Sequence, residues 1–321
     1  MKPSSTTRRR ALGVAAAAAA ALVIGACAPE APPSTTTPTS STSTTSTTVA
    51  PNPVKAVSNA TLQWTISQEA NNAAFAPGQY NFWNAGTAPA TNDATYLATN
   101  GDITIQKKNA AGTYVNIGSE SAVSYANRGK NGNGTTVTAT GATKLDQRIL
   151  LTGGEGTVNT TTGAATIEWD GAFTINFYGT FVPFQIIDPV LTVDAAGNGK
   201  LTASATGIAK DAENPDAPGT PIPATAVTLA DIPNVYGSGT RTSGFTNAAT
   251  SYLDTAVTVP GSVTPQAAKT GANQAFWGSW PQSFVDFQVV TGASSYFYTS
   301  AGSVDHFKPQ APVSVAYNLA P

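Results

Sequence analysis

The fold class can be predicted from one segment, Ala165-Thr-Ile-Glu-Trp-Asp-Gly-Ala-Phe-Thr-Ile-Asn-Phe177. Small or apolar residues occupy every second position of this stretch, and most of the residues between them are polar. A period of two is typical of a β-strand that buries one face, because successive side chains point to opposite sides of the strand. We therefore predict one long strand over residues 165–177.

The same period recurs along most of the chain. Leu191 and Val193 lead through Gly197-Asn198-Gly199 to Leu201 and Ala203, and this turn chemistry predicts a β-hairpin. The other predicted strands are Thr61–Ser67, Gly101–Lys107, Thr135–Thr140, Gln147–Thr152, Ala224–Leu229, Asp254–Val259 and Pro312–Tyr317.

The resulting fold class is all-β, an antiparallel β-sandwich-like domain with one or two short helices. The one helix that the pattern favours in this domain lies around Gln282–Gln288. We interpret the Gly-rich and Ser-rich stretch Val235–Asn247 as a loop within a single domain rather than as a boundary between two.

The N-terminus has the organisation of an export signal. Three arginines, Arg8 to Arg10, precede the apolar run Ala11–Ile24, whose 14 residues fall short of the roughly 20 that a membrane-spanning helix needs. The run ends in Ile24-Gly25-Ala26-Cys27, the pattern of a lipobox, and Cys27 is the only cysteine. We predict a signal peptide over 1–26, lipidation of Cys27 and anchoring to the outer face of the cytoplasmic membrane. Twin-arginine and general secretory export are both compatible with the arginines.

The residues after Cys27 are mainly Ser, Thr and Pro and show no apolar period. Such a composition cannot bury enough surface to offset the entropy of ordering, so we expect a disordered tether over 27–56 and a β domain over 57–321.

Charge argues against some partners. Removal of residues 1–26 takes away four cations and no acid, so the 16 cations become 12 against 18 acids, a formal net charge of −6. A net negative surface disfavours nucleic acid and anionic lipid as ligands. The predicted contact with the membrane is therefore made through the lipid on Cys27.

The inventory of catalytic side chains is small. The chain has one histidine, His306, and one cysteine, the predicted lipidation site Cys27, so a zinc site built from His and Cys is excluded. No Gly-x-Ser-x-Gly motif is present. Glu168 and Asp170 alternate on the polar face of the predicted strand, where solvated charges are common, and the Gly153–Gly156 cluster is interpreted as a turn. We expect no enzymatic activity.

The chain also carries several groups of aromatic residues. The run Phe177–Phe184 breaks the alternation at a glycine and a proline, and Phe297 and Tyr298 form a pair near the C-terminus. These rings fill a β core or line a pocket, and composition alone leaves both interpretations open.

Several segments resemble the actinobacterial HtaA-type haem-uptake domain, as one domain with insertions over about 60–317. The opening Leu62-Gln63-Trp64 is similar to that family's first strand. The other similar segments are Gly153–Val158, Gly163–Thr166, Asp188–Val193, Gly199–Ala203, Tyr296–Gly302 and Pro312–Val315.

The resemblance implies a surface domain that binds haem and passes it to haem-transport proteins. The family's tyrosine ligand falls near Ala73 in this chain, and its Gly-His pair falls on Phe177 and Tyr178. Tyrosinate is a known haem ligand, so Tyr178 is the expected iron ligand, and Phe297 and Tyr298 carry over as haem contacts. Haem is the cofactor that the resemblance implies.

Two functions therefore stand as hypotheses. The first is a haem-binding lipoprotein of the cell surface that uses Tyr178, Phe297 and Tyr298. The second is a non-enzymatic envelope module that binds a protein or a glycan, with exposed aromatic residues such as Trp277 and Trp280 at its contact surface.

Overall fold

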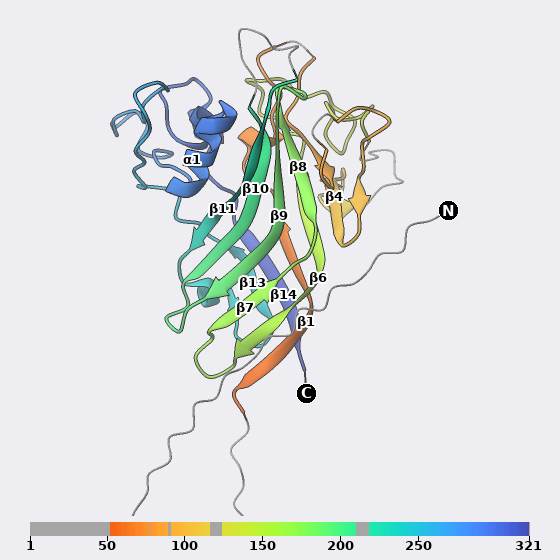
Figure 1. Ribbon diagram of the computed structural model, residues 1–321, viewed down its shortest axis with the longest axis vertical. Coiled ribbons are helices and arrows are strands. Elements are labelled where there is room, and N and C mark those ends of the chain that lie inside the picture. Colours follow the sequence, from red (N-terminus) through yellow and green to blue (C-terminus); the bar gives the residue numbers. More distant parts are fainter. Residues whose placement is uncertain (1–51, 77, 89–90, 116–123, 210–217, 321) are drawn as a thin grey trace, which may run out of the picture. The chain divides into compact units, whose positions relative to one another are not determined.

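The computed structural model describes residues 52–76, 78–88, 91–115, 124–209 and 218–320 (Figure 1), all within one compact unit, Pro51–Pro321. The predicted signal peptide, Cys27 and the tether up to residue 51 lie outside the described residues. The first strand begins at Val54, three residues before the expected start of the domain.

The expectation of an all-β fold is confirmed, because the described residues contain 14 strands, whose pairings are all antiparallel, and a single α-helix. The strands are β1 Val54–Trp64, β2 Phe82–Ala85, β3 Thr99–Asn100, β4 Ile103–Lys108, β5 Tyr114–Val115, β6 Gln147–Asn159, β7 Ala165–Glu168, β8 Ala172–Phe177, β9 Val182–Val193, β10 Gly199–Ala209, β11 Thr220–Ile232, β12 Gly239–Thr240, β13 Gly244–Ala248 and β14 Val313–Leu319. The helices are α1 Gln282–Thr291 and the 3₁₀ turns η1 Glu69–Asn71, η2 Val235–Ser238, η3 Ser294–Phe297 and η4 Asp305–Phe307.

The main path of the sheet runs β11-β10-β9-β7-β6-β1-β14-β13-β12. The hairpin predicted around Gly197-Asn198-Gly199 is present as β9 and β10, with Val193 opposite Gly199. The expected single strand over 165–177 is instead divided into β7 and β8 by Trp169–Gly171. The sheet opens at this break: β9 pairs with β7 along one half and with β8 along the other, while β6 pairs with β7 and then with β4.

The strand breaks at Gly171, whose φ of 117° is left-handed and whose N–H donates to the carboxylate of Asp188 at 2.8 Å. Trp169 keeps the alternation: its side chain is buried, and its indole N–H donates to the carbonyl of Ala60 at 2.9 Å. A Cβ on Gly154 would lie 2.4 Å from the indole nitrogen, so only glycine leaves room for the ring. The interpretation of Gly153–Gly156 as a turn is therefore wrong: the cluster lies inside β6, beside the register irregularity between β1 and β6.

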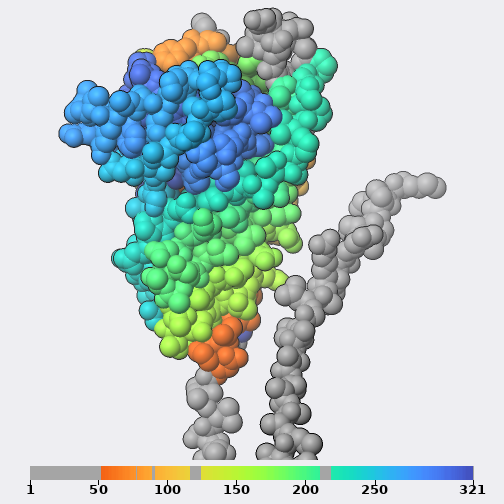
Figure 2. Space-filling model, turned by 60° about the vertical axis from the view of Figure 1, so that its left-hand side comes forward, coloured from red at the N-terminus to blue at the C-terminus, as the bar shows by residue number. Residues whose placement is uncertain are grey.

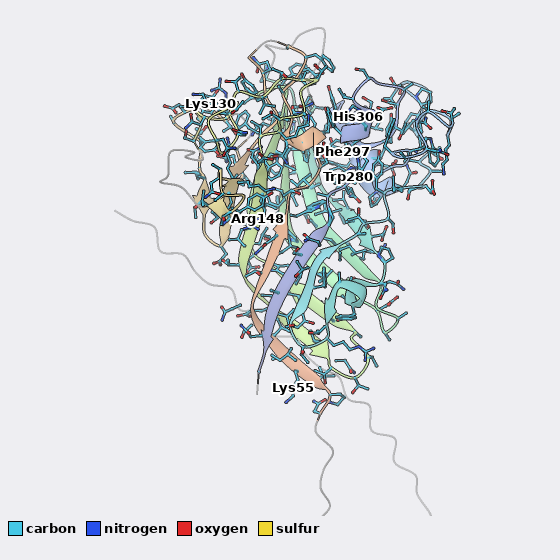
Figure 3. The ribbon with its side chains drawn as sticks, turned by 180° about the vertical axis from the view of Figure 1, so that it is seen from behind. Lys55, Lys130, Arg148, Trp280, Phe297 and His306 are labelled. Atoms are coloured by element: carbon cyan, nitrogen blue, oxygen red, sulfur yellow. The ribbon has the colours of Figure 1, made fainter. Side chains whose placement is uncertain are left out.

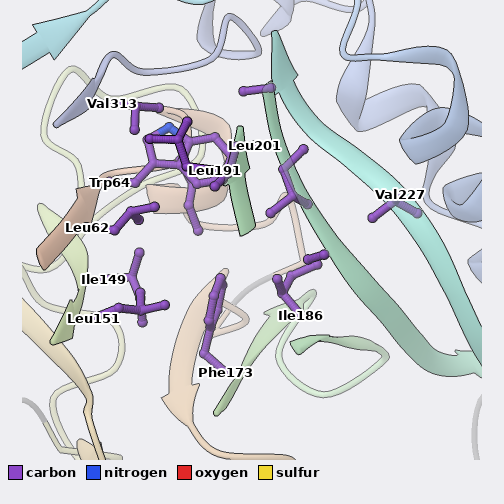
Figure 4. Packing of buried hydrophobic residues seen from close by; sticks show 14 of the residues in the cluster. Leu62, Trp64, Ile149, Leu151, Phe173, Ile186, Leu191, Leu201, Val227 and Val313 are labelled. Carbon is purple, nitrogen blue, oxygen red and sulfur yellow. The ribbon is translucent and has the colours of Figure 1, made fainter. Parts of the chain in front are cut away.

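The inner face of the sheet carries the apolar core (Figure 4). Leu62 and Trp64 of β1, Ile149 and Leu151 of β6 and Val313 of β14 are all at most 3% exposed. The buried face predicted for residues 165–177 is confirmed, because Ile167, Phe173 and Ile175 are also at most 3% exposed.

Helix α1, drawn in blue in Figure 1, packs against β10 and β11. In the space-filling view of Figure 2, blue residues gather at one end of the described unit, above the green ones. The helix ends at Gly292, whose φ of 82° is left-handed and whose N–H bonds back to the last turn. The Ser283 hydroxyl accepts a hydrogen bond from the Thr228 N–H at 2.9 Å and so ties the helix to the outermost strand of this side.

Two predicted strands are absent, although their residues are described. In 254–259 the backbone N–H groups of Val257 and Thr258 donate to the side chains of Gln266 and Gln282, so side chains replace a strand partner. Residues 135–140 make one isolated bridge, Lys130 with Thr136. The stretch Val235–Asn247, expected to be a loop, instead contains η2, β12 and part of β13, which extends the sheet beside β14.

Candidate functional site

Tyr178 lies in the turn between β8 and β9, with a left-handed φ of 51°. Its N–H donates to the side chain of Asn81 at 3.1 Å, and its ring lies 5.7 Å from that of Tyr296. The side chain is half-buried.

Phe297 and Tyr298 lie in the same region but inside the core, exposed by 1% and 0%. The ring of Phe297 packs 4.9 Å from Phe284 and 5.2 Å from Trp280. The Tyr298 hydroxyl donates to the carbonyl of Thr264. The open slot beside Phe297 that a flat macrocycle requires is therefore absent in this conformation, because neighbouring rings occupy the space.

Other residues singled out in the sequence have ordinary environments. Ala73, at the family's tyrosine position, is buried in a small cluster with Val137 and Leu145. His306 is exposed on η4, with its ring 3.9 Å from that of Phe307.

The expectation of exposed tryptophans holds only in part. Trp280 is 1% exposed, so its proposed role at a contact surface is wrong. Trp277 is half-buried, and its indole N–H donates to Ala267. Glu168 and Asp170 are exposed, as expected, and line none of the cavities described below.

The most polar of the described cavities lies at the ends of β1 and β6, facing β5 and the segment 309–312. It has a volume of about 670 Å³. A neighbouring cavity of about 230 Å³ shares Thr65, Lys108, Tyr114 and Pro312 with it. We call the two together the basic groove, because Lys108, Lys144 and Arg148 line it against a single acid, Asp146.

Arg148 of β6 is the best-defined cation of the groove. Its Nε donates to the side-chain oxygen of Gln106 at 2.9 Å, and one terminal nitrogen donates to that of Gln63 at 2.8 Å. Its guanidinium lies over the ring of Tyr114, 4.1 Å from the centroid. Amides and a phenol hold this cation, and within the described residues it forms no ion pair with a carboxylate.

Lys108 and Asp146 lie beside the same ring. The Lys108 ammonium is 5.4 Å from the centre of the Tyr114 ring. Burial raises the pKa of Asp146, and Lys108 and Lys107 oppose this rise. Burial also raises the pKa of Tyr114, while Arg148 lowers it. The phenol therefore stays neutral, and the groove keeps an excess of positive charge.

Two lysines of this region, Lys107 and Lys144, are buried, and their ammonium groups donate hydrogen bonds to neutral acceptors. Lys107, 1% exposed, donates to the carbonyls of Asn127 and Lys130, and burial lowers its pKa to about 8. Lys144 donates to Asn72 Oδ1 at 3.0 Å, and burial lowers its pKa to about 8, against the pull of Glu69. Below pH 8 both add positive charge at or behind the groove.

The sequence contains a signal for this site that the net charge concealed. Six of the 12 cations that remain after residue 26 lie between Lys107 and Arg148, a stretch with only two acids, Glu120 and Asp146. Three of these six cations, Lys108, Lys144 and Arg148, line the groove, so the argument from a net charge of −6 does not apply to it.

A third cavity, of about 720 Å³, lies across β6, β7, β9 and β10 near Val54. Its one cation, Lys200, pairs with Asp231 at 3.0 Å. This cavity has no uncompensated positive charge, which distinguishes it from the basic groove.

Within the described part of the chain, no group of three or more His, Cys, Asp or Glu side chains could hold a metal ion. None of the described helices is long and apolar enough to cross a membrane. No family model, no curated protein and no solved structure matches this chain. The resemblance to the HtaA-type domain therefore stays a prediction.

Proposed function

We propose that this protein is an exported, lipid-anchored and non-enzymatic binding module, which captures an anionic ligand of the cell envelope in its basic groove. The export signal and Cys27 of the sequence support the location. The groove supports the binding role.

One observation carries the proposal: Arg148 is half-buried and has no carboxylate partner within the described residues. A buried charge is normally paired, because removal from water costs several kcal/mol per ion. Gln63 and Gln106 orient the guanidinium but leave its charge unbalanced, and two of its five N–H donors have no hydrogen bond within the described residues. An incoming carboxylate or phosphate supplies both the charge and the acceptors.

The polar groups of the groove support binding rather than catalysis. Its one acid, Asp146, has Lys107 and Lys108 as charged neighbours, and no second carboxylate or imidazole lines the cavities to act as its acid–base partner. We infer that the ligand leaves the site unchanged.

Haem binding through Tyr178, Phe297 and Tyr298 has less support. The two C-terminal rings are buried among other aromatic residues, and only Tyr178 retains partial exposure. A hemin titration, described in the Discussion, tests this alternative directly.

The experiment that tests the proposed function is chromatography of the full-length protein, purified in detergent, on immobilised polygalacturonate and on neutral dextran. We expect retention on the acidic matrix only, and elution by moderate salt. Arg148→Gln should elute at clearly lower salt. Arg241→Gln is the matched control, since Arg241 is exposed and contacts the carbonyl of Thr161, away from the groove.

Equal retention of the wild type on both matrices would refute the function. Equal retention of the wild type and the Arg148 variant on polygalacturonate would refute the site. If Arg148→Gln does not fold, Lys108→Gln repeats the test with a half-buried side chain for which no hydrogen bond is seen in the described structure.

A further inference from the structure

The basic groove is long enough to hold more than one chemical group. Its two cavities share four residues, and together they extend from Asn247 and Ser314 at one end to Thr143 and Pro309 at the other. Their volumes, about 670 and 230 Å³, add to the size of a site that holds several sugar units rather than one small ion.

The cations are spread along this length. Arg148 lines the smaller cavity, Lys144 lines the larger, and Lys108 lines both. A site for one small anion would place its cations around a single point. Cations at intervals match a ligand that carries acidic groups at intervals.

The remaining polar groups fit hydroxyl-rich ligands. Gln68 and Thr143 line the larger cavity, and Asn247 and Ser314 line the smaller. Amides and hydroxyls both donate and accept hydrogen bonds, as sugar hydroxyls do. Tyr114 supplies one aromatic ring beside the cations.

A peptide and a nucleic acid fit less well. An extended peptide binds by pairing with an open strand edge. Among the described strands at the groove, β1, β4 and β6 have partners on both sides, and β5, which pairs with β4 alone, is only two residues long. A single-stranded nucleic acid needs a series of stacking rings. Two aromatic residues line the described groove: Trp64 is 3% exposed, and Arg148 already lies over the ring of Tyr114.

We propose that the basic groove binds a segment of acidic polysaccharide, several sugar units long, whose carboxylate or phosphate groups lie against Arg148, Lys108 and Lys144. This inference rests on the proposed function, because it specifies the ligand of the same site. Carboxylate and phosphate share the chemistry of the contact, and the experiment separates them.

Calorimetric titration with a length series tests the inference. Galacturonic acid and its trimer and hexamer are titrated into the full-length protein, and a parallel series of glycerol phosphate oligomers forms the second arm. We expect the affinity to rise at least tenfold from monomer to hexamer in one arm or in both. The stronger arm identifies the acidic group.

Two variants test whether each cation contributes to the gain in affinity with ligand length. Arg148→Gln and Lys108→Gln should each lower the affinity for the hexamer several-fold and reduce the gain with length. Arg241→Gln should leave both unchanged. Unfolding temperatures are measured in parallel to show that each variant is folded.

The outcomes separate the two claims. If the monomer binds as tightly as the hexamer and Arg148→Gln abolishes binding, the groove captures an anion and the polysaccharide inference is wrong. If no member of either series binds and the acidic matrix retains nothing, the proposed function itself is wrong. A gain with length that survives both variants would place the polymer elsewhere on the molecule and overturn the inference.

Discussion

The aromatic cluster around Phe297 and the basic groove around Arg148 differ in whether neighbouring side chains complete their packing and balance their charge. Phe297 is surrounded by Phe177, Phe184, Trp280 and Phe284 at ring distances between 4.9 and 6.1 Å, so its contacts are complete within the fold. Arg148 is held in place by neutral groups, so its charge is not balanced within the described fold. Figure 3 shows Arg148 and Lys130 apart from Trp280, Phe297 and His306.

This comparison shows that the number of residues of one type in the sequence does not locate the ligand-binding site. The aromatic residues are numerous in the sequence, yet most of those near the C-terminus stabilise the core. The groove contains common polar residues, and it is their incomplete charge pairing that favours a ligand.

The largest expected effect is on stability, in the aromatic cluster around Phe297. Phe297→Ala should lower the free energy of unfolding by about 3–5 kcal/mol, because it removes a buried ring and leaves a cavity among neighbouring rings. Denaturant titration measures this loss. Phe75→Ala, at a 57% exposed phenylalanine, is the matched control and should change stability by less than about 0.5 kcal/mol. A loss similar to that of the control would show that Phe297 is accessible, as a ligand contact would be.

The next effect concerns Glu69, which is buried behind the groove. Burial raises its pKa from 4.5 to about 7, while Lys308 and Lys144 oppose the rise and Asp305 adds to it. A carboxyl whose pKa is raised on folding binds its proton more tightly in the folded state. Its stabilising contribution is therefore present below about pH 4.5 and is lost as the pH rises to about 7.

Glu69→Gln should remove that dependence. The wild type is expected to lose about 3 kcal/mol between pH 4.5 and 8 relative to this variant, from a pKa difference of about 2.5 units. Unfolding free energies at the two pH values measure it. Glu155→Gln, at an exposed position on β6, should follow the wild type. Parallel curves for the wild type and Glu69→Gln would contradict the assignment.

A smaller, local effect is expected at Lys107. Its ammonium joins β4 to the carbonyls of Asn127 and Lys130, near Asn131 in the wall of the groove. Lys107→Met should speed amide exchange over 124–137 about tenfold, equivalent to about 1.4 kcal/mol of local opening, and leave exchange in β9 and β10 unchanged. Lys55→Met, near the beginning of β1, is the control (Figure 3). Uniform acceleration across the sheet would indicate a global role instead.

The smallest expected effect tests haem. Hemin titrated into the wild type and into Tyr178→Phe should give the same absorbance change, because the turn at Tyr178 adjoins packed rings and no cavity described above. Tyr178→Phe keeps the ring and removes only the hydroxyl. A saturable Soret band in the wild type that disappears in the variant would restore tyrosinate ligation and the haem-uptake hypothesis.

The sequence predicted local features well where a periodic pattern coincides with a buried face. The hairpin at Gly197-Asn198-Gly199 and the buried face of residues 165–177 are as expected, and α1 begins at the predicted residue, Gln282. The prediction failed where a distant partner intervenes. The strand predicted over 165–177 divides at Gly171, whose N–H donates to the carboxylate of Asp188, 17 residues away, and residues 254–259 bond to glutamine side chains instead of to a strand.

The alternation of apolar and polar residues was enough to predict an all-β domain and the buried face of residues 165–177, because alternation is a property of neighbouring residues. The export signal and the lipobox at Cys27 stay predictions from the sequence, because they lie outside the described residues. Only the tertiary structure decided which aromatic residues are core and which cations lack a partner. Arg148 meets Gln106, 42 residues away, and Gln63, 85 residues away, so its environment depends on contacts that no local pattern contains.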